Sequence, residues 1–115
     1  MKPHDLFTAL EAEILPTEGA LEIENAYTGD LLSDVIANAP DKSVLITIQA
    51  HLNAVAVASM AGAGAILVCN NRPVPEDMLE AAKREGIAVA RTSRDQFRSS
   101  YLVFRILKEH GCFPD

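Results

Sequence analysis

The most constraining feature of this 115-residue chain is a series of short apolar runs, each followed by a cluster of polar residues. Three runs, at residues 44–48, 65–69 and 87–90, are continuous rather than alternating. Strands that are apolar on both faces are typical of a parallel sheet covered by helices. A fourth run at 20–27 alternates apolar and polar residues, which favours an edge strand. The runs therefore predict an α/β fold with a mainly parallel sheet of about four strands.

Helix signals lie between these runs, in segments at 5–14, 31–39, 54–61, 75–86 and 94–110. Asp30, Asn53 and Ser93 stand where helix N-caps are expected, and Gly86 stands where a helix should end. Strands that alternate with helices form parallel sheets through right-handed crossovers. The length fits one domain over residues 1–115.

Charge and composition exclude several classes of function. The chain has 16 acidic and 10 basic residues and a formal net charge of −6, which disfavours nucleic acid and anionic membrane surfaces as partners. No apolar segment approaches the length of a membrane span, and no secretory signal begins the chain. Cys69 and Cys112 are too few for a disulfide framework, and Cys69 ends an apolar run, where a small buried residue is expected. We therefore expect a cytoplasmic chain.

The polar residues after the runs are the candidate binding residues, because the carboxyl ends of parallel strands meet at one crevice. The candidates are Thr28, Gly29, Asp30, Gln49, His51, Asn53, Asn71, Arg72 and Thr92. Arg72 presents a planar fork suited to carboxylate or phosphate, and a histidine such as His51 can act as a general base or a metal ligand. We expect this crevice to sense a small anionic ligand or a nucleotide. The alternatives are helix capping for Asp30, a solvated loop residue for Arg72 and an ordinary loop histidine for His51.

No catalytic motif accompanies these residues. The chain has no phosphate-binding loop, dinucleotide fingerprint or nucleophile elbow. The other histidines, His4 and His110, lie at the two ends of the chain, so the spacing predicts no metal site and no cofactor. An alternative is a small enzyme in which His51 acts chemically, Asp30 or Gln49 orients the substrate and Arg72 holds an anion.

The last predicted helix has more apolar surface than one contact with a sheet needs. Phe97, Tyr101 and Phe104 form one stripe that ends at Lys108. A second set, Leu102, Val103, Ile106 and Leu107, widens the apolar arc. Excess apolar surface of this kind marks interfaces, so we expect a homodimer contact, with a helix wedged between two elements as the alternative.

Taken together, residues 27–35, 45–53 and 75–86 resemble the DRTGG domain family, and the similarity extends over residues 5–107. Thr28 and Gly29 match the Thr-Gly of the Asp-Arg-Thr-Gly-Gly motif that names the family. Tyr27 and Asp30 stand in place of its Arg and its last Gly. The segment 65–92 is also similar to the N-terminal domain of HPr kinase/phosphorylase.

This resemblance implies a three-layer α/β/α fold and a regulatory or protein-interaction domain rather than an enzyme. Domains of the family accompany CBS-domain pyrophosphatases and phosphotransacetylases, and some stand alone beside iron hydrogenase genes. An accessory protein of a redox complex of the hydrogenase type is therefore a further alternative.

Overall fold

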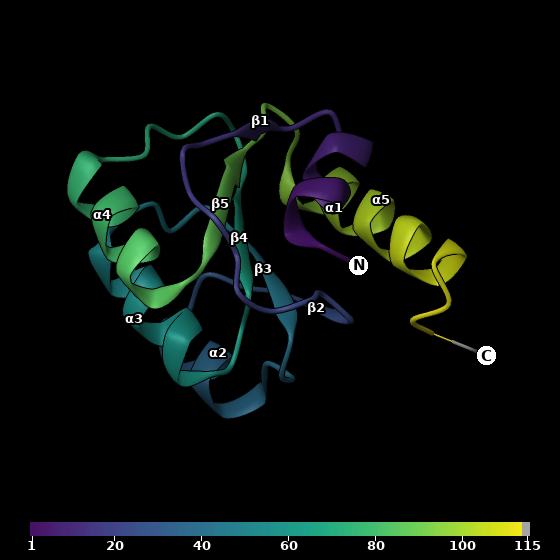
Figure 1. Cartoon of the computed structure of the whole chain (residues 1–115), viewed down its shortest axis with the longest axis horizontal. Helices are drawn as coiled ribbons and strands as arrows, with labels where there is room; N and C mark the ends of the chain where they lie inside the picture. The colour runs from purple at the N-terminus through teal and green to yellow at the C-terminus, as the bar shows by residue number, and fades with distance from the viewer. Residues whose placement is uncertain (114–115) are drawn as a thin grey trace.

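The computed structural model describes residues 1–113, which form a central sheet between two layers of helices (Figure 1). In chain order the elements are α1 (Pro3–Ala9), β1 (Glu13–Ile14), β2 (Asn25–Thr28), α2 (Leu32–Asn38), β3 (Ser43–Thr47), α3 (Leu52–Met60), β4 (Ala65–Val68), α4 (Glu76–Glu85), β5 (Ala88–Arg91) and α5 (Gln96–Glu109). The strand order is β1-β5-β4-β3-β2, and β2 to β5 are parallel. The predicted α/β fold with a mainly parallel sheet is confirmed.

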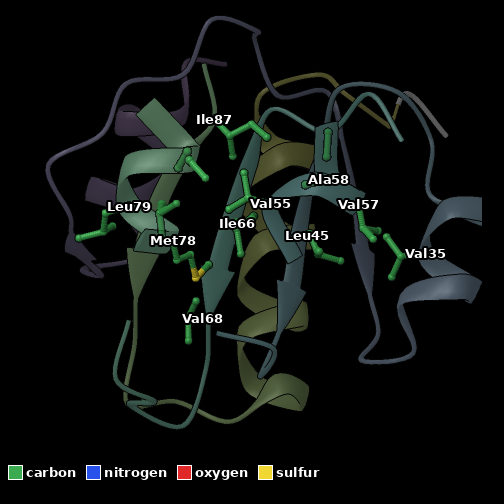
Figure 2. Close-up of a cluster of buried hydrophobic side chains, with 14 residues drawn as sticks. Val35, Leu45, Val55, Val57, Ala58, Ile66, Val68, Met78, Leu79 and Ile87 are labelled. Carbon is green, nitrogen blue, oxygen red and sulfur yellow. The ribbon is translucent and has the colours of Figure 1, made fainter. Parts of the chain in front are cut away.

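Two apolar clusters hold the layers together, one on each face of the sheet. Helices α2, α3 and α4 cover one face, while α1 and α5 cover the other (Figure 1). Figure 2 shows the first cluster, in which Leu45 of β3 faces the three helices. Its neighbours Val44 and Ile46 belong to the second cluster. Both faces of β3 are thus buried, which is why its sequence is a continuous apolar run.

The sheet has a fifth strand that the sequence pattern does not predict. β1 has two exposed residues and pairs antiparallel with β5, matching Glu13 with Arg91. The Glu13 and Arg91 side chains also form an ion pair at 2.8 Å. The predicted helix at 5–14 ends at Ala9, because Glu11 adopts a left-handed backbone conformation with φ 56°. A two-residue strand is too short to leave a periodic pattern.

The other boundaries agree more closely with the sequence. The predicted strand at 20–27 begins only at Asn25, and it lies at an edge of the sheet as expected. Gly86 ends α4 in the left-handed conformation, with φ 68°. Asp95 rather than Ser93 caps α5, since its side chain accepts a hydrogen bond from the backbone N–H of Arg98. Within residues 1–113 no helix has the length and apolar content needed to cross a membrane.

Candidate functional site

Asp30 lies after β2 and organises the carboxyl edge of the sheet. Its Oδ1 accepts hydrogen bonds from Thr47 Oγ1 at 2.8 Å, Ile48 N at 2.9 Å and Gln96 Nε2 at 3.0 Å. The predicted capping role of Asp30 is wrong, because Leu31 is the N-cap residue of α2 and the helix has no side-chain cap. Three protein donors occupy the Asp30 carboxylate, which therefore joins β2, the end of β3 and α5.

Gln49 links Asp30 to His51. Gln49 Nε2 donates to the backbone carbonyl of Asp30 at 2.8 Å, which directs Gln49 Oε1 toward His51. That oxygen lies 2.7 Å from His51 Nε2. Since a carbonyl oxygen only accepts, Nε2 carries the hydrogen and Nδ1 of a neutral His51 keeps its lone pair. Asp30, Gln49 and His51 thus form one hydrogen-bonded chain.

Asn53 does not cap α3. The N-cap residue is His51, without a side-chain hydrogen bond to the helix, and Asn53 is exposed in the first turn. The predicted cap at Asn53 is therefore wrong. Asn53 instead lines a surface hollow of about 530 Å³ between the starts of α3 and α4, together with His51, Leu52, Pro75 and Asp77. Neither helix has a side-chain cap at this end.

Thr28 and Gly29 are held by the protein itself. Thr28 Oγ1 lies 2.7 Å from Ser100 Oγ on α5. The Gly29 N–H donates to the carbonyl of Ile46 at 3.1 Å. A Cβ added to Gly29 would meet the ring of Tyr27 at 3.5 Å, which is an ordinary contact. No close approach of the backbone therefore requires glycine at position 29.

Asn71, Arg72 and Thr92 lie in two loops that are joined by backbone hydrogen bonds. Asn70 and Asn71 have φ values of 58° and 52°, and their N–H groups donate to the carbonyls of Arg94 and Thr92. Thr92 is buried and its Oγ1 accepts from the N–H of Arg94 at 3.2 Å. Arg72 is exposed, and its guanidinium makes no ion pair with residues 1–113. Of these three candidates, Arg72 is the one directed to solvent with its charge unpaired.

The structure thus divides the candidates into two groups at one edge of the sheet. Asp30, Gln49 and His51 follow β2 and β3, whereas Asn71, Arg72 and Thr92 follow β4 and β5. The two groups begin side by side, because Thr47 of β3 pairs with Val68 of β4. A larger hollow of about 680 Å³ is lined by none of the candidates. Among residues 1–113, no group of three or more His, Cys, Asp or Glu side chains is placed to hold a metal ion.

Three residues that shape this edge are not among the candidates. Thr47 and Gln96 bond Asp30, and Ser100 bonds Thr28. Gln96 follows Ser93 by three residues, which is the spacing of a capping box, so its sequence position indicates a local role instead of a contact 66 residues away. Of these three residues, only Thr47 gives a signal in the sequence, because it is a hydroxyl residue inside an otherwise apolar run.

Cys69 lies beneath this edge as a buried residue, as expected. Its Sγ donates to Ser99 Oγ on α5 at 3.5 Å. Burial raises the pKa of the Cys69 thiol, and the Ser99 hydrogen bond opposes that shift. The thiol is therefore protonated at neutral pH and packs as a small apolar group.

No protein-family model matches the chain, and neither does any curated protein. Among solved structures, the fold is similar to the CBS and DRTGG domains of the regulatory region of Clostridium perfringens pyrophosphatase, which were crystallised with the activator diadenosine tetraphosphate. The TM-score is 0.67 at 15% identity, and the match covers 89% of this chain and 45% of that one. The chain therefore spans less than half of that structure. The comparison shows that this chain shares a fold with part of that regulatory region.

Proposed function

We propose that this chain is a cytoplasmic, DRTGG-like regulatory or protein-interaction domain over residues 1–115, related to the N-terminal domain of HPr kinase/phosphorylase. It acts without catalysis, as a homodimer, and senses a small anionic ligand or a nucleotide at the carboxyl ends of its strands. The similar structure from C. perfringens supports this proposal, since it is a regulatory region in complex with a nucleotide activator.

The observation that carries the ligand part is the unpaired cation at the strand ends. Arg72 is exposed without an ion-pair partner in residues 1–113, and His51 lines the hollow at the start of α3. The start of a helix bears partial positive charge. Glu76 and Asp77 offset that charge at the start of α4, so the start of α3 is the more favourable end for an anion. His51 would then accept a hydrogen bond at Nδ1 from an N–H or O–H group of the ligand.

The candidate residues form two groups, according to whether their polar groups are already hydrogen-bonded within the protein. We assign ligand contact to His51, Asn53, Asn71 and Arg72. Thr28, Gly29, Asp30, Gln49 and Thr92 form the supporting frame, because their polar groups are bonded within the protein. A ligand that reached the Asp30 carboxylate would have to displace its donors.

Thermal shift measurements with inorganic phosphate, AMP and ATP test the ligand part. We expect at least one of these to raise the unfolding temperature of the wild type, because a ligand that binds only the folded state stabilises it. Arg72→Ala and His51→Ala should lose the effect. The matched control is Arg84→Ala, which removes an exposed arginine from the last turn of α4. A wild type unaffected by all three at millimolar concentration would leave only the protein-interaction role.

A small enzyme is the second candidate, and the hydrogen bond between Gln49 and His51 favours it. In that enzyme Gln49 would orient His51, Nδ1 would act as the base and Arg72 would hold an anionic substrate. Asp30 is a poor orienting group, since its carboxylate already accepts from Thr47, Ile48 and Gln96. Hydrolysis of activated phosphate or acyl esters that disappears in His51→Ala and persists in His4→Ala would favour the enzyme.

A further inference from the structure

The exposed aromatic residues of α5 do not form one uniform surface. Phe104 stacks on Phe113, with the two ring centroids 5.0 Å apart, whereas Phe97 stacks on no aromatic ring within residues 1–113. Phe97 is also the more exposed of the two, at 81% against 51% for Phe104. The stripe that the sequence predicts as a homodimer contact thus has two parts. The homodimer contact stays a prediction for the Phe104 end, and the Phe97 end has a different shape.

A hollow of about 290 Å³ lies at the Phe97 end of α5. Its lining combines two aromatic rings with two arginines and a leucine: Arg94, Phe97, Arg98, Tyr101 and Leu102. Arg105 already covers the Tyr101 ring, with its Cζ 5.7 Å from the ring centroid, so Phe97 is the ring left free to stack on a ligand. Pockets for small ligands measure about 300–1,000 Å³, so this hollow has room for one flat ring system and not for a larger molecule.

Arg94 supplies this hollow with a positive charge that no carboxylate balances. Its Nη1 donates to the backbone carbonyl of Leu10 at 2.6 Å, which holds the guanidinium in place without neutralising it. Within residues 1–113, Arg94 forms no ion pair, whereas the guanidinium of Arg98 is paired with Asp95 at 2.7 Å. Arg94 therefore keeps its other N–H donors and its charge for an anionic group.

Two hydrogen bonds join the hollow to the binding edge of the sheet. The N–H of Asn70 donates to the carbonyl of Arg94 at 3.0 Å, so the loop of Arg72 is bonded to the segment that lines the hollow. Gln96, the residue before Phe97, donates to Asp30 Oδ1 at 3.0 Å. The hollow is therefore at the same edge of the sheet as the unpaired Arg72.

We propose that this hollow binds the aromatic ring of the sensed ligand, stacked on Phe97, while Arg94 holds an anionic group of the same molecule. A nucleotide combines these two features, since it carries a flat base and a phosphate. Stacking of bases on aromatic side chains tolerates any base, because every base has a π-face. This inference rests on the ligand part of the proposed function and deepens it, since it makes the ligand an aromatic anion.

Calorimetric titration with AMP and with ribose 5-phosphate tests the inference, because the second compound has the phosphate and lacks the base. We expect the wild type to bind AMP about ten- to a hundredfold more tightly than ribose 5-phosphate. Phe97→Ala should remove this difference by weakening AMP binding alone. Phe104→Ala is the matched control, since it removes the same ring from the same helix outside the hollow and should keep the difference.

Two further variants report on the stacking and on the charge. The chain has no tryptophan, so Phe97→Trp places a single fluorescent indole in the hollow. AMP should quench its emission, and ribose 5-phosphate should not. Arg94→Gln should weaken the binding of both compounds by about tenfold and leave their ratio unchanged, because it removes the charge and not the ring.

The possible results separate this inference from the proposed function. Equal binding of AMP and ribose 5-phosphate by the wild type would overturn the hollow as a ring site and leave the anion site in place. A preference for AMP that Phe97→Ala keeps would do the same. Ribose 5-phosphate binding that Arg94→Gln leaves unchanged would overturn the role of Arg94. A wild type that binds neither compound at millimolar concentration would overturn the ligand part of the proposed function and this inference with it.

Discussion

Replacing Asp30 with alanine tests whether this residue supports the fold, as its hydrogen bonds indicate. The substitution removes the acceptor of Thr47 Oγ1, Ile48 N and Gln96 Nε2, which lie at 2.8, 2.9 and 3.0 Å from Asp30 Oδ1. It leaves the backbone carbonyl that accepts from Gln49 in place. Because the donors come from β3 and α5, their loss should affect global unfolding and not only the loop after β2.

The expected loss of stability follows from those three bonds. A hydrogen bond to a charged group contributes about 1.5–3 kcal/mol, so three of them set an upper bound of about 5–9 kcal/mol. Asp30 is only half-buried, and water can reach some of the released donors. We therefore expect Asp30→Ala to lower the free energy of unfolding by about 2–4 kcal/mol. For a chain of this length the unfolding temperature should fall by about 8–16 °C.

Urea unfolding followed by far-ultraviolet circular dichroism measures this loss, since the chain has no tryptophan to report on tertiary structure. Asp30→Asn should be intermediate, because it keeps an acceptor but loses the charge. Glu80→Ala is the control: it removes an exposed carboxylate from α4 and should change stability by no more than about 0.5 kcal/mol. If Asp30→Ala also stayed within about 0.5 kcal/mol of the wild type, the supporting role would be refuted.

Three further outcomes follow from local geometry and charge. The hydrogen bond to Asp34 raises the pKa of the Tyr27 hydroxyl. The contribution of this shift to the stability of the fold is therefore present below pH 10.0 and is lost as the pH rises above that value. Tyr27→Phe should flatten this alkaline decline in stability. Burial raises the pKa of Cys69, so a thiol reagent near neutral pH should label Cys112 first and Cys69 only on unfolding, as followed by mass spectrometry. Gly86→Ala should cost about 1–2 kcal/mol in urea unfolding, because φ is 68°.

Each of these three predictions can be contradicted by a specific observation. An alkaline decline unchanged in Tyr27→Phe would assign it to other groups. Rapid labelling of Cys69 in the folded protein would show that the core beneath the strand ends opens readily. The control for Gly86 is Gly29→Ala, where φ is not positive and the new methyl group makes ordinary contacts. Equal costs at the two glycines would contradict the argument from backbone conformation.

The sequence was sufficient to predict the parallel strands because burial on both faces leaves a local pattern. Every residue of β3 and β4 is buried, and both strands contain consecutive apolar residues, at 44–46 and 65–68. β1 could not be predicted, since its two exposed residues pair with a strand more than 70 positions away. Gly86 was predicted as a helix end because its cause is also local. Local causes were visible in the sequence, and pairing between distant segments was not.

The same distinction explains Asp30. An aspartate directly before a helical pattern most often caps that helix, so the local rule favoured a cap. The sheet register decides otherwise: Thr28 pairs with Ile46, so the chain two residues on brings Asp30 beside Ile48, whose N–H it accepts. The carboxylate therefore accepts hydrogen bonds from β3 and does not cap α2. Gln96 of α5 donates a further hydrogen bond to it.

The hydrogen bonds of Asp30 also connect the binding edge of the sheet with α5. Because Asp30 bonds both the end of β3 and the first residue of α5, movement of the His51 segment is resisted by contacts that reach the start of α5. A ligand that displaced Gln49 or His51 would therefore act on the position of α5 through Asp30. Ligand binding and dimerisation should then be linked, and by reciprocity the dimer should bind the ligand with a different affinity from the monomer. Dimer dissociation constants measured with and without a stabilising anion test this, and Gln96→Ala should weaken the linkage while leaving both sites in place.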